Sequence, residues 1–174
     1  MTTVILPSTL ETITGRAFEG LTKLNNISFP NGNDNYQIND GCLLGNEGKD
    51  LIYVIPTKTE INIPDSVTTI KICAINSGDL EYLSIPDTVT TLENMIFRNT
   101  NNLKRIHIGS GVSSLSSQFK AWISTPNGLK IEIDGNNQNY KVEGNLILTK
   151  NETEVVTYVD GNVLSQTFPT NVVK

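Results

Sequence analysis

The chain is poor in the residues on which most catalytic and metal sites depend. Its 174 residues include one histidine, two cysteines and one tryptophan. His107 has no second histidine with which to hold a metal, and Cys42 and Cys73 lack the spacing of a zinc site or a disulfide scaffold. We expect both cysteines to be free, buried thiols. No glycine-rich phosphate loop is present either. The sequence therefore predicts no catalytic, cofactor or metal site, and no enzyme.

Basic charge and long apolar runs are also scarce. The chain has 13 Lys and Arg against 18 Asp and Glu, for a net charge of −5. Nucleic-acid and anionic-membrane binding both need clustered positive charge, so the balance argues against these partners. No apolar run approaches the ~20 residues that span a bilayer. Met1–Pro7 also lacks the basic and then apolar pattern of a signal peptide.

What the chain does contain is a repeat. Pro-Asp-Ser-Val-Thr-Thr-Ile at Pro64–Ile70 returns as Pro-Asp-Thr-Val-Thr-Thr-Leu at Pro86–Leu92, 22 residues later, and as Gly-Ser-Gly-Val-Ser-Ser-Leu at Gly109–Leu115, 23 residues later. An earlier copy occupies Leu6–Ile13. A period of ~20–29 residues with Leu and Ile anchors is typical of a leucine-rich repeat solenoid. We expect one such domain over residues 1–174.

Each coil has two segments that favour β-structure. One is Leu-x-x-Leu-x-Ile, ending at Phe29, Ile85 and Ile108, and the other is Val-Thr-Thr-Ile or a variant of it. The Ala-Phe-like pairs between them predict a single helical or 3-10 turn per coil; they are Ala17-Phe18, Ala74-Ile75 and Ile96-Phe97. The predicted fold is therefore a β-rich, right-handed solenoid of the α/β horseshoe type.

Two stretches, about 33–56 and 137–160, interrupt the period and match each other. Each opens with Asn-Tyr and continues through an apolar segment, a polar turn and a second apolar segment. Two apolar segments about a short polar turn predict a β-hairpin, so we expect two hairpin linker modules. Thr3–Pro7 and Phe168–Lys174 look like parts of further coils. Since neither has the polar character of a capping repeat, we expect a segment of a longer array.

The spacing Leu-x-x-Leu-x-Ile-Pro-x-x-Val-x-x-Ile-x-x-x-Ala-Phe resembles the BspA-like leucine-rich repeats. The Asn-Tyr modules are similar to the linker units found among those repeats. The resemblance covers nearly the whole chain, although Cys73–Ile75 and Gln118–Lys120 depart from the Ala-Phe pair. It implies a secreted or cell-surface microbial protein that binds host proteins or neighbouring cells.

The alternation within the Leu-x-x-Leu-x-Ile segments predicts which side chains point outward. The candidate partner-binding residues are Asn26, Ser28, Tyr82, Ser84, Arg105 and His107. Adjacent strands lie ~4.8 Å apart, so Tyr82, Arg105 and His107 should form one patch. Tyr and Arg are enriched at the energetic centres of protein interfaces. The alternative for the whole set is an ordinary solvated face, because any such solenoid displays outward polar residues.

Two classes of function remain open at this point. The first is non-catalytic binding of a protein partner through this patch. The second is a structural spacer, or a segment that associates with itself through uncapped ends, with no ligand of its own. A third class, a carbohydrate-active domain, would need clustered aromatic side chains, and Trp122 is the single tryptophan.

Overall fold

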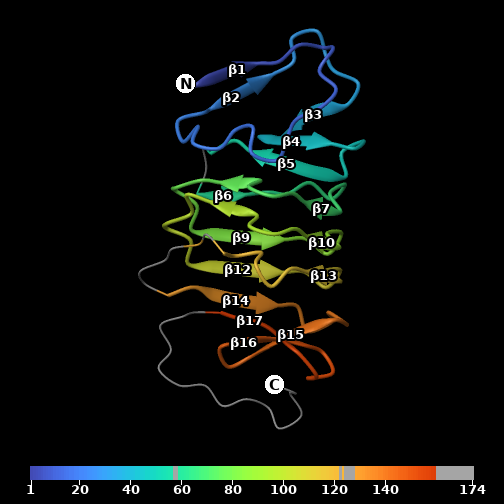
Figure 1. The fold of residues 1–174 in the computed structure, drawn as a ribbon, viewed down its shortest axis with the longest axis vertical. Helices are drawn as coiled ribbons and strands as arrows, with labels where there is room; N and C mark the ends of the chain where they lie inside the picture. The colour runs from blue at the N-terminus through green and yellow to red at the C-terminus, as the bar shows by residue number, and fades with distance from the viewer. Residues whose placement is uncertain (57–58, 122, 124–127, 160–174) are drawn as a thin grey trace.

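A computed structural model describes residues 1–56, 59–121, 123 and 128–159. Trp122 and the predicted coil fragment Phe168–Lys174 lie outside these residues. The described chain forms a stack of short strands that runs from the N-terminal to the C-terminal end of the molecule (Figure 1). Successive coils place equivalent strands side by side, so the molecule is a β-solenoid.

The predicted face lies on a four-stranded parallel sheet with the order β14–β12–β9–β6. Its strands are β6 (Glu60–Ile61), β9 (Tyr82–Ile85), β12 (Arg105–Ile108) and β14 (Lys130–Ile133). In the register, Leu83 pairs with Ile106 and Ile106 with Ile131. These aliphatic residues are buried, as the alternation within each segment predicts.

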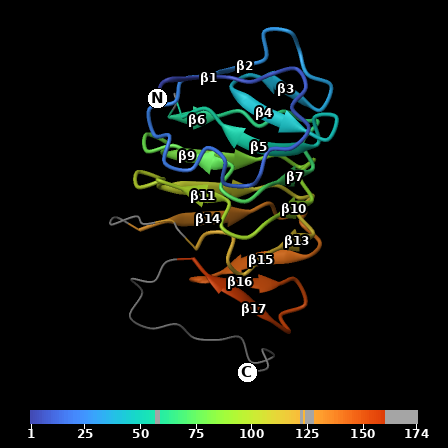
Figure 2. The same cartoon turned by 45° about the horizontal axis from the view of Figure 1, so that its top comes forward.

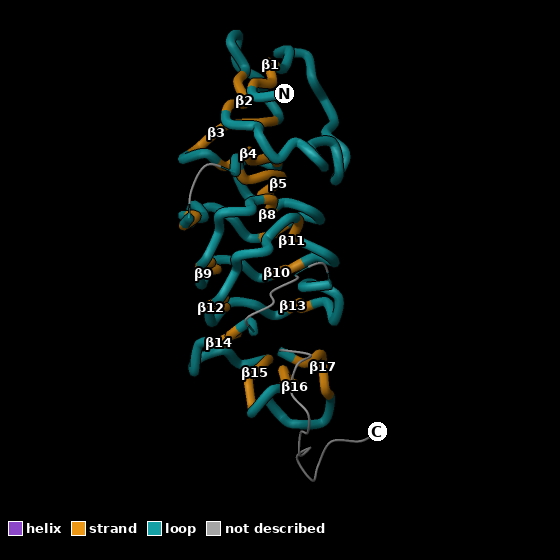
Figure 3. The backbone as a smooth tube through the Cα atoms, turned by 90° about the vertical axis from the view of Figure 1, so that its left-hand side faces the viewer, coloured by secondary structure: helices purple, strands orange, loops and turns teal. Residues whose placement is uncertain are grey.

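The Val-Thr-Thr-Ile segments form strands on the other side of the solenoid. They are β7 (Thr69–Ile70), β10 (Thr91–Leu92) and β13 (Ser114–Leu115), and they pair in parallel. Figure 3 shows β9 and β12 on one wall and β10 and β13 on the other. The apolar core fills the space between the walls, and each coil completes the core of its neighbour.

Each of the two interrupting stretches forms three antiparallel strands. The first module contains β3 (Tyr36–Asn39), β4 (Cys42–Gly45) and β5 (Asp50–Val54). The second module contains β15 (Tyr140–Glu143), β16 (Leu146–Thr149) and β17 (Val155–Tyr158). The last two strands of each module are the predicted hairpin, and the Asn-Tyr segment adds the third. Figure 2 shows the modules at different levels of the stack, with the plain coils between them.

The predicted helical turns and the α/β horseshoe type are wrong. Among the described residues there is no helical or 3-10 segment. Two of the three Ala-Phe-like pairs instead enter the strands β8 (Ile75–Asn76) and β11 (Phe97–Arg98), and Ala17-Phe18 lies in a turn. Cys73 and Met95, just before these strands, have φ of 58° and 49°, which is incompatible with a right-handed helix. The backbone amide of Ile75 donates to the Ile96 carbonyl of the next coil at 2.9 Å rather than within its own turn.

The first coil packs against the first module in a small core of its own. Its strands β1 (Thr3–Ile5) and β2 (Asn26–Ser28) form a separate two-stranded sheet. Phe18 of this coil lies against Tyr53 of β5, with ring centroids 4.9 Å apart. Cys42 and Cys73 are both buried thiols that are not joined in a disulfide, as predicted from their spacing.

Candidate functional site

The outward side chains of the four-stranded sheet form two rows across the coils. The register aligns Glu60, Tyr82, Arg105 and Lys130 in one row, and Ser84, His107 and Glu132 in the other. Outward and inward positions alternate because successive side chains of a strand point to opposite faces. We call these seven residues the sheet face. They are half-buried or exposed, whereas the intervening Leu83, Ile85, Ile106 and Ile108 are fully buried.

The structure brings together four of the six candidate partner-binding residues, including the three of the predicted patch. Tyr82 pairs with Arg105 and Ser84 pairs with His107 in adjacent strands. Asn26 and Ser28 lie apart from them, on β2, because the first module interrupts the stack between β2 and β6. The role of all six residues in binding stays a prediction.

Arg105 is held in place from two directions. Its Cζ lies 5.6 Å from the centroid of the Tyr82 ring, a cation–π contact. Its Nε donates to Oε2 of Glu132 at 2.9 Å, and its Nη2 lies 2.5 Å from the same oxygen. The hydrogen bond to Glu132 raises the pKa of Arg105 above its ordinary value. The guanidinium is therefore ordered on the surface although the side chain is 51% exposed.

Glu132 is the acidic centre of this network. The ammonium of Lys130 lies 2.8 Å from its Oε1. Hydrogen bonds from Lys130 and then from Arg105 lower the pKa of Glu132 to about 2. On the neighbouring coils, Lys104 and Glu81 form a further ion pair at 2.9 Å. The sheet face thus combines an aromatic ring with opposite charges that compensate one another.

Lys130 and Glu132 were not among the predicted residues. The interval between Arg105 and its register partner Lys130 is longer than the repeat period, so the coil that contains β14 looks irregular in the sequence. The alternation Leu129-Lys-Ile-Glu-Ile133 is the signal that would have identified β14, because alternating apolar residues favour a strand with one buried face.

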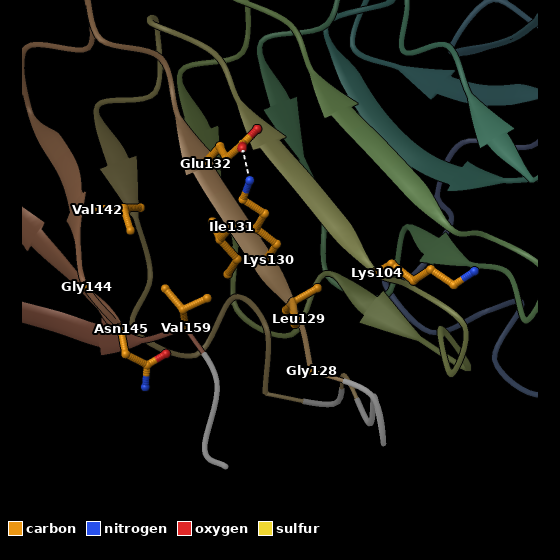
Figure 4. A pocket seen from close by; sticks show the side chains of 10 residues that line it. All are labelled: Lys104, Gly128, Leu129, Lys130, Ile131, Glu132, Val142, Gly144, Asn145 and Val159. Atoms are coloured by element: carbon orange, nitrogen blue, oxygen red, sulfur yellow. Dashed lines mark ion pairs between the residues drawn. The ribbon is translucent and has the colours of Figure 1, made fainter. Parts of the chain in front are cut away.

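A groove of about 720 Å³ lies beside the sheet face, between β14 and the second module (Figure 4). Leu129 and Ile131 line it from the coil, and Val142 and Val159 line it from the module. Lys104, Lys130 and Glu132 are at its rim, so the groove adjoins the sheet face.

Neither a metal centre nor a membrane helix is found in the described ranges. Within 1–56, 59–121, 123 and 128–159, no group of three or more His, Cys, Asp and Glu residues is placed to hold a metal ion. No helix of the described chain is long and apolar enough to cross a membrane.

Several solved structures are similar to this chain. One is the pneumococcal vaccine antigen PcpA, with 18% identity and a TM-score of 0.57 over 79% of this chain and 40% of that chain. Two more are a leucine-rich cell surface protein from Faecalibacterium prausnitzii (18% identity, 78% of this chain and 48% of that chain, TM-score 0.48) and a leucine-rich repeat protein from Eubacterium ventriosum (16% identity, 76% and 49%, TM-score 0.46). The chain spans less than half the length of each.

The sequence itself matches a family of repeats. No curated protein matches it. The model of the BspA type leucine rich repeat region, which contains six copies, matches residues 1–52 and 55–124. This match covers more than half of the chain, describes a repeat region and indicates no catalytic domain. The chain therefore belongs to the BspA-type leucine-rich repeat family.

Proposed function

We propose that the chain is a non-catalytic protein-binding or adhesion module of a secreted or cell-surface microbial protein. It binds host or neighbouring-cell proteins through the sheet face. The observation that supports this most is the ordered arrangement of Tyr82, Arg105 and Glu132 on one continuous parallel sheet. Leucine-rich repeats and other solenoids use extended surfaces of this kind to bind proteins.

The chemistry of the sheet face suits an interface centre. Tyr and Arg contribute large contact areas and are enriched at such centres. Arg105 is already fixed by Tyr82 and Glu132, so less side-chain entropy is lost when a partner covers it. His107 lies beside Ser84 in the second row and extends the patch.

A structural role is the second candidate. Ile5 on the edge strand β1 is 68% exposed, and open strand edges favour pairing with another chain. In this reading the segment is a spacer that associates with itself, and the sheet face has no ligand.

An array of extracellular host and microbial proteins tests the proposed function. It is probed with the wild-type chain, with the triple variant Tyr82→Ala/Arg105→Ala/His107→Ala, and with the control Thr69→Ala/Thr91→Ala/Ser114→Ala. The control changes outward side chains on β7, β10 and β13, on the opposite wall. We expect a partner that wild type and control bind equally and that the sheet-face variant binds at least tenfold more weakly, since loss of an interface centre costs about 2 kcal/mol or more. Equal binding by all three proteins would contradict the proposal.

A further inference from the structure

The modules interrupt the parallel sheet that forms the sheet face. In the described chain, β2 pairs with β1, β6 pairs with β9, and the first-module strands between them pair with neither. The strand β5 instead joins β7 on the other wall. At the second module, β14 is likewise the last strand of its sheet among the described residues, and β15–β17 form a sheet of their own. The first module has coils on both sides of it, so the module itself, and not an end of the stack, causes the break in the sheet there.

The interruption leaves the backbone of β14 with one edge toward the groove. The amides of Lys130 and Asp134 donate to the carbonyls of Lys104 and Ile108 in the preceding coil, each at 2.9 Å. Backbone groups of a strand point alternately to its two sides. The N–H and C=O groups of Ile131 and Ile133 therefore point away from β12, toward the side on which the groove lies.

We propose that this groove receives an extended segment of a partner protein, which adds to β14 as a further parallel strand. Such strand addition combines main-chain hydrogen bonds, here with Ile131 and Ile133, with pockets for alternate side chains. It would constitute a binding site in addition to the sheet face, and it does not depend on that face having a ligand.

The register of the sheet specifies the chemistry of the segment. The residue that continues the row of Tyr82, Arg105 and Lys130 lies beside Lys130. The Lys130 side chain is 69% exposed, so an acidic residue at this position can share its ammonium with Glu132. The next residue continues the buried row of Leu83, Ile106 and Ile131 and is apolar; it enters the groove against Val142 and Val159. Two positions further on, the row of Ile108 and Ile133 requires a second apolar residue.

The partner segment thus has the pattern acidic–apolar–any–apolar. A strand of the same sheet has this pattern, β6 with its extension, Glu60-Ile-Asn-Ile63. There Glu60 is exposed and Ile61 and Ile63 are buried. A synthetic peptide with the sequence of residues 59–64, Thr-Glu-Ile-Asn-Ile-Pro, is therefore a suitable probe.

The test is an NMR titration of the full ¹⁵N-labelled chain with this peptide, up to millimolar concentration. We expect saturable shifts of the Ile131 and Ile133 amides. In each strand of this sheet, the amide in the row of Arg105 and Lys130 points toward the preceding strand: Arg105 donates to the Glu81 carbonyl and Lys130 to the Lys104 carbonyl. The peptide amides of Glu and Asn should therefore point toward β14. N-methylation of the peptide at Glu or Asn should abolish the shifts. N-methylation at either Ile should be tolerated.

A charge exchange supplies the matched control. A peptide with Lys in place of Glu should bind wild type about two- to fivefold more weakly, the range of an exposed ion pair, and this preference should reverse in Lys130→Glu. Val142→Arg should block the groove, whereas the triple sheet-face variant should bind the peptide like wild type.

Three results would overturn the proposal. The first is that no saturable shift occurs, and the second is that the shifts lie at Tyr82, Arg105 and His107. The third is that the shifts appear when the protein concentration alone is raised. The last outcome would make the occupant a second copy.

Discussion

Asn137 donates from its side-chain amide to the backbone carbonyl of Val112 at 3.0 Å, and thereby joins the second module to the coil before it. Its Oδ1 accepts from the amide of Tyr140 at 2.8 Å, and the Tyr140 hydroxyl accepts from the amide of Leu115 at 3.3 Å. Asn33 and Tyr36 make equivalent bonds in the first module, to the carbonyl of Leu10 at 3.0 Å and from the amide of Ile13 at 2.8 Å. The same Asn–Tyr pair docks both modules.

Asn137→Ala should lower the free energy of unfolding by about 2–4 kcal/mol, since a fully buried amide leaves several backbone groups without a partner. Asn33→Ala is the matched control. Because Asn33 is only half-buried, water replaces part of its bonds, and the loss should be about 1 kcal/mol. Urea denaturation of both variants measures the difference. Equal losses in the two variants would show that burial of the Asn side chain does not determine how much its hydrogen bonds stabilise the contact between module and coil.

Gly111 is required by the close approach of two coils. A Cβ built on Gly111 lies 1.9 Å from the backbone carbonyl oxygen of Asp87. The two coils are also joined here, because Oδ1 of the Asp87 side chain accepts from the Ser110 amide at 2.6 Å. Gly111→Ala should therefore destabilise the chain by about 1–3 kcal/mol through overpacking. A Cβ on Gly135 meets nothing within 4 Å, so Gly135→Ala should leave the melting temperature unchanged or raise it slightly. A Gly111→Ala variant with the same melting temperature as the wild type would contradict the close contact between these coils.

Thr100 is fully buried, and its hydroxyl has no hydrogen-bond partner in the described chain. Thr100→Val keeps the shape of the side chain and removes an unpaired polar atom. We expect a gain of about 1 kcal/mol in the free energy of unfolding. Thr88→Val, at an exposed position, should change it little. Chemical denaturation distinguishes the two variants, and a loss of stability in Thr100→Val would reveal a bonded hydroxyl.

The network around Glu132 makes a prediction about pH. The pKa of Glu132 is lowered from 4.5 to about 2, so its ionised form favours the folded state. The resulting stabilisation is fully present above pH 4.5 and is lost as the pH falls through about 2. An NMR titration of the Glu132 carboxyl should show its midpoint near 2 and an upward shift in Lys130→Gln and Arg105→Gln. The variant Lys104→Gln, whose ammonium pairs with Glu81, should leave it unchanged. A midpoint that does not respond to Lys130 and Arg105 would refute the assignment of the pKa shift to these two.

The strands of the two walls were predictable because the burial of each apolar residue in them follows from its neighbours in the sequence. Leu83 and Ile106 alternate with polar residues and recur at the repeat period, so their burial and the outward position of Tyr82 and Arg105 follow from the sequence. Ile75 and Phe97 suggested a helical turn because Ala-Phe-like pairs occur in helices. The outcome depends on the left-handed conformation of Cys73 and Met95 and on bonds to the next coil, which no local pattern contains.

The candidate site was predictable in part for the same reason. The neighbours on β9 and β12 follow from the period, whereas Glu132 and Lys130 occupy a coil of unusual length. Asn26 and Ser28 fit the alternation, but the first module separates their strand from the sheet face. The groove depends on how the second module packs beside β14, and this packing is between elements whose local sequence patterns do not specify it.

Sedimentation velocity over a concentration series tests most directly whether the sheet face is available to a foreign protein. The wild-type chain and the triple variant Tyr82→Ala/Arg105→Ala/His107→Ala are compared under the same conditions. We predict that both remain monomeric across the series, because the charges on the sheet face are compensated within one chain and Arg105 lies over the Tyr82 ring. Self-association of the wild type that disappears in the variant would contradict this account, because the sheet face would then be a contact between copies of the chain.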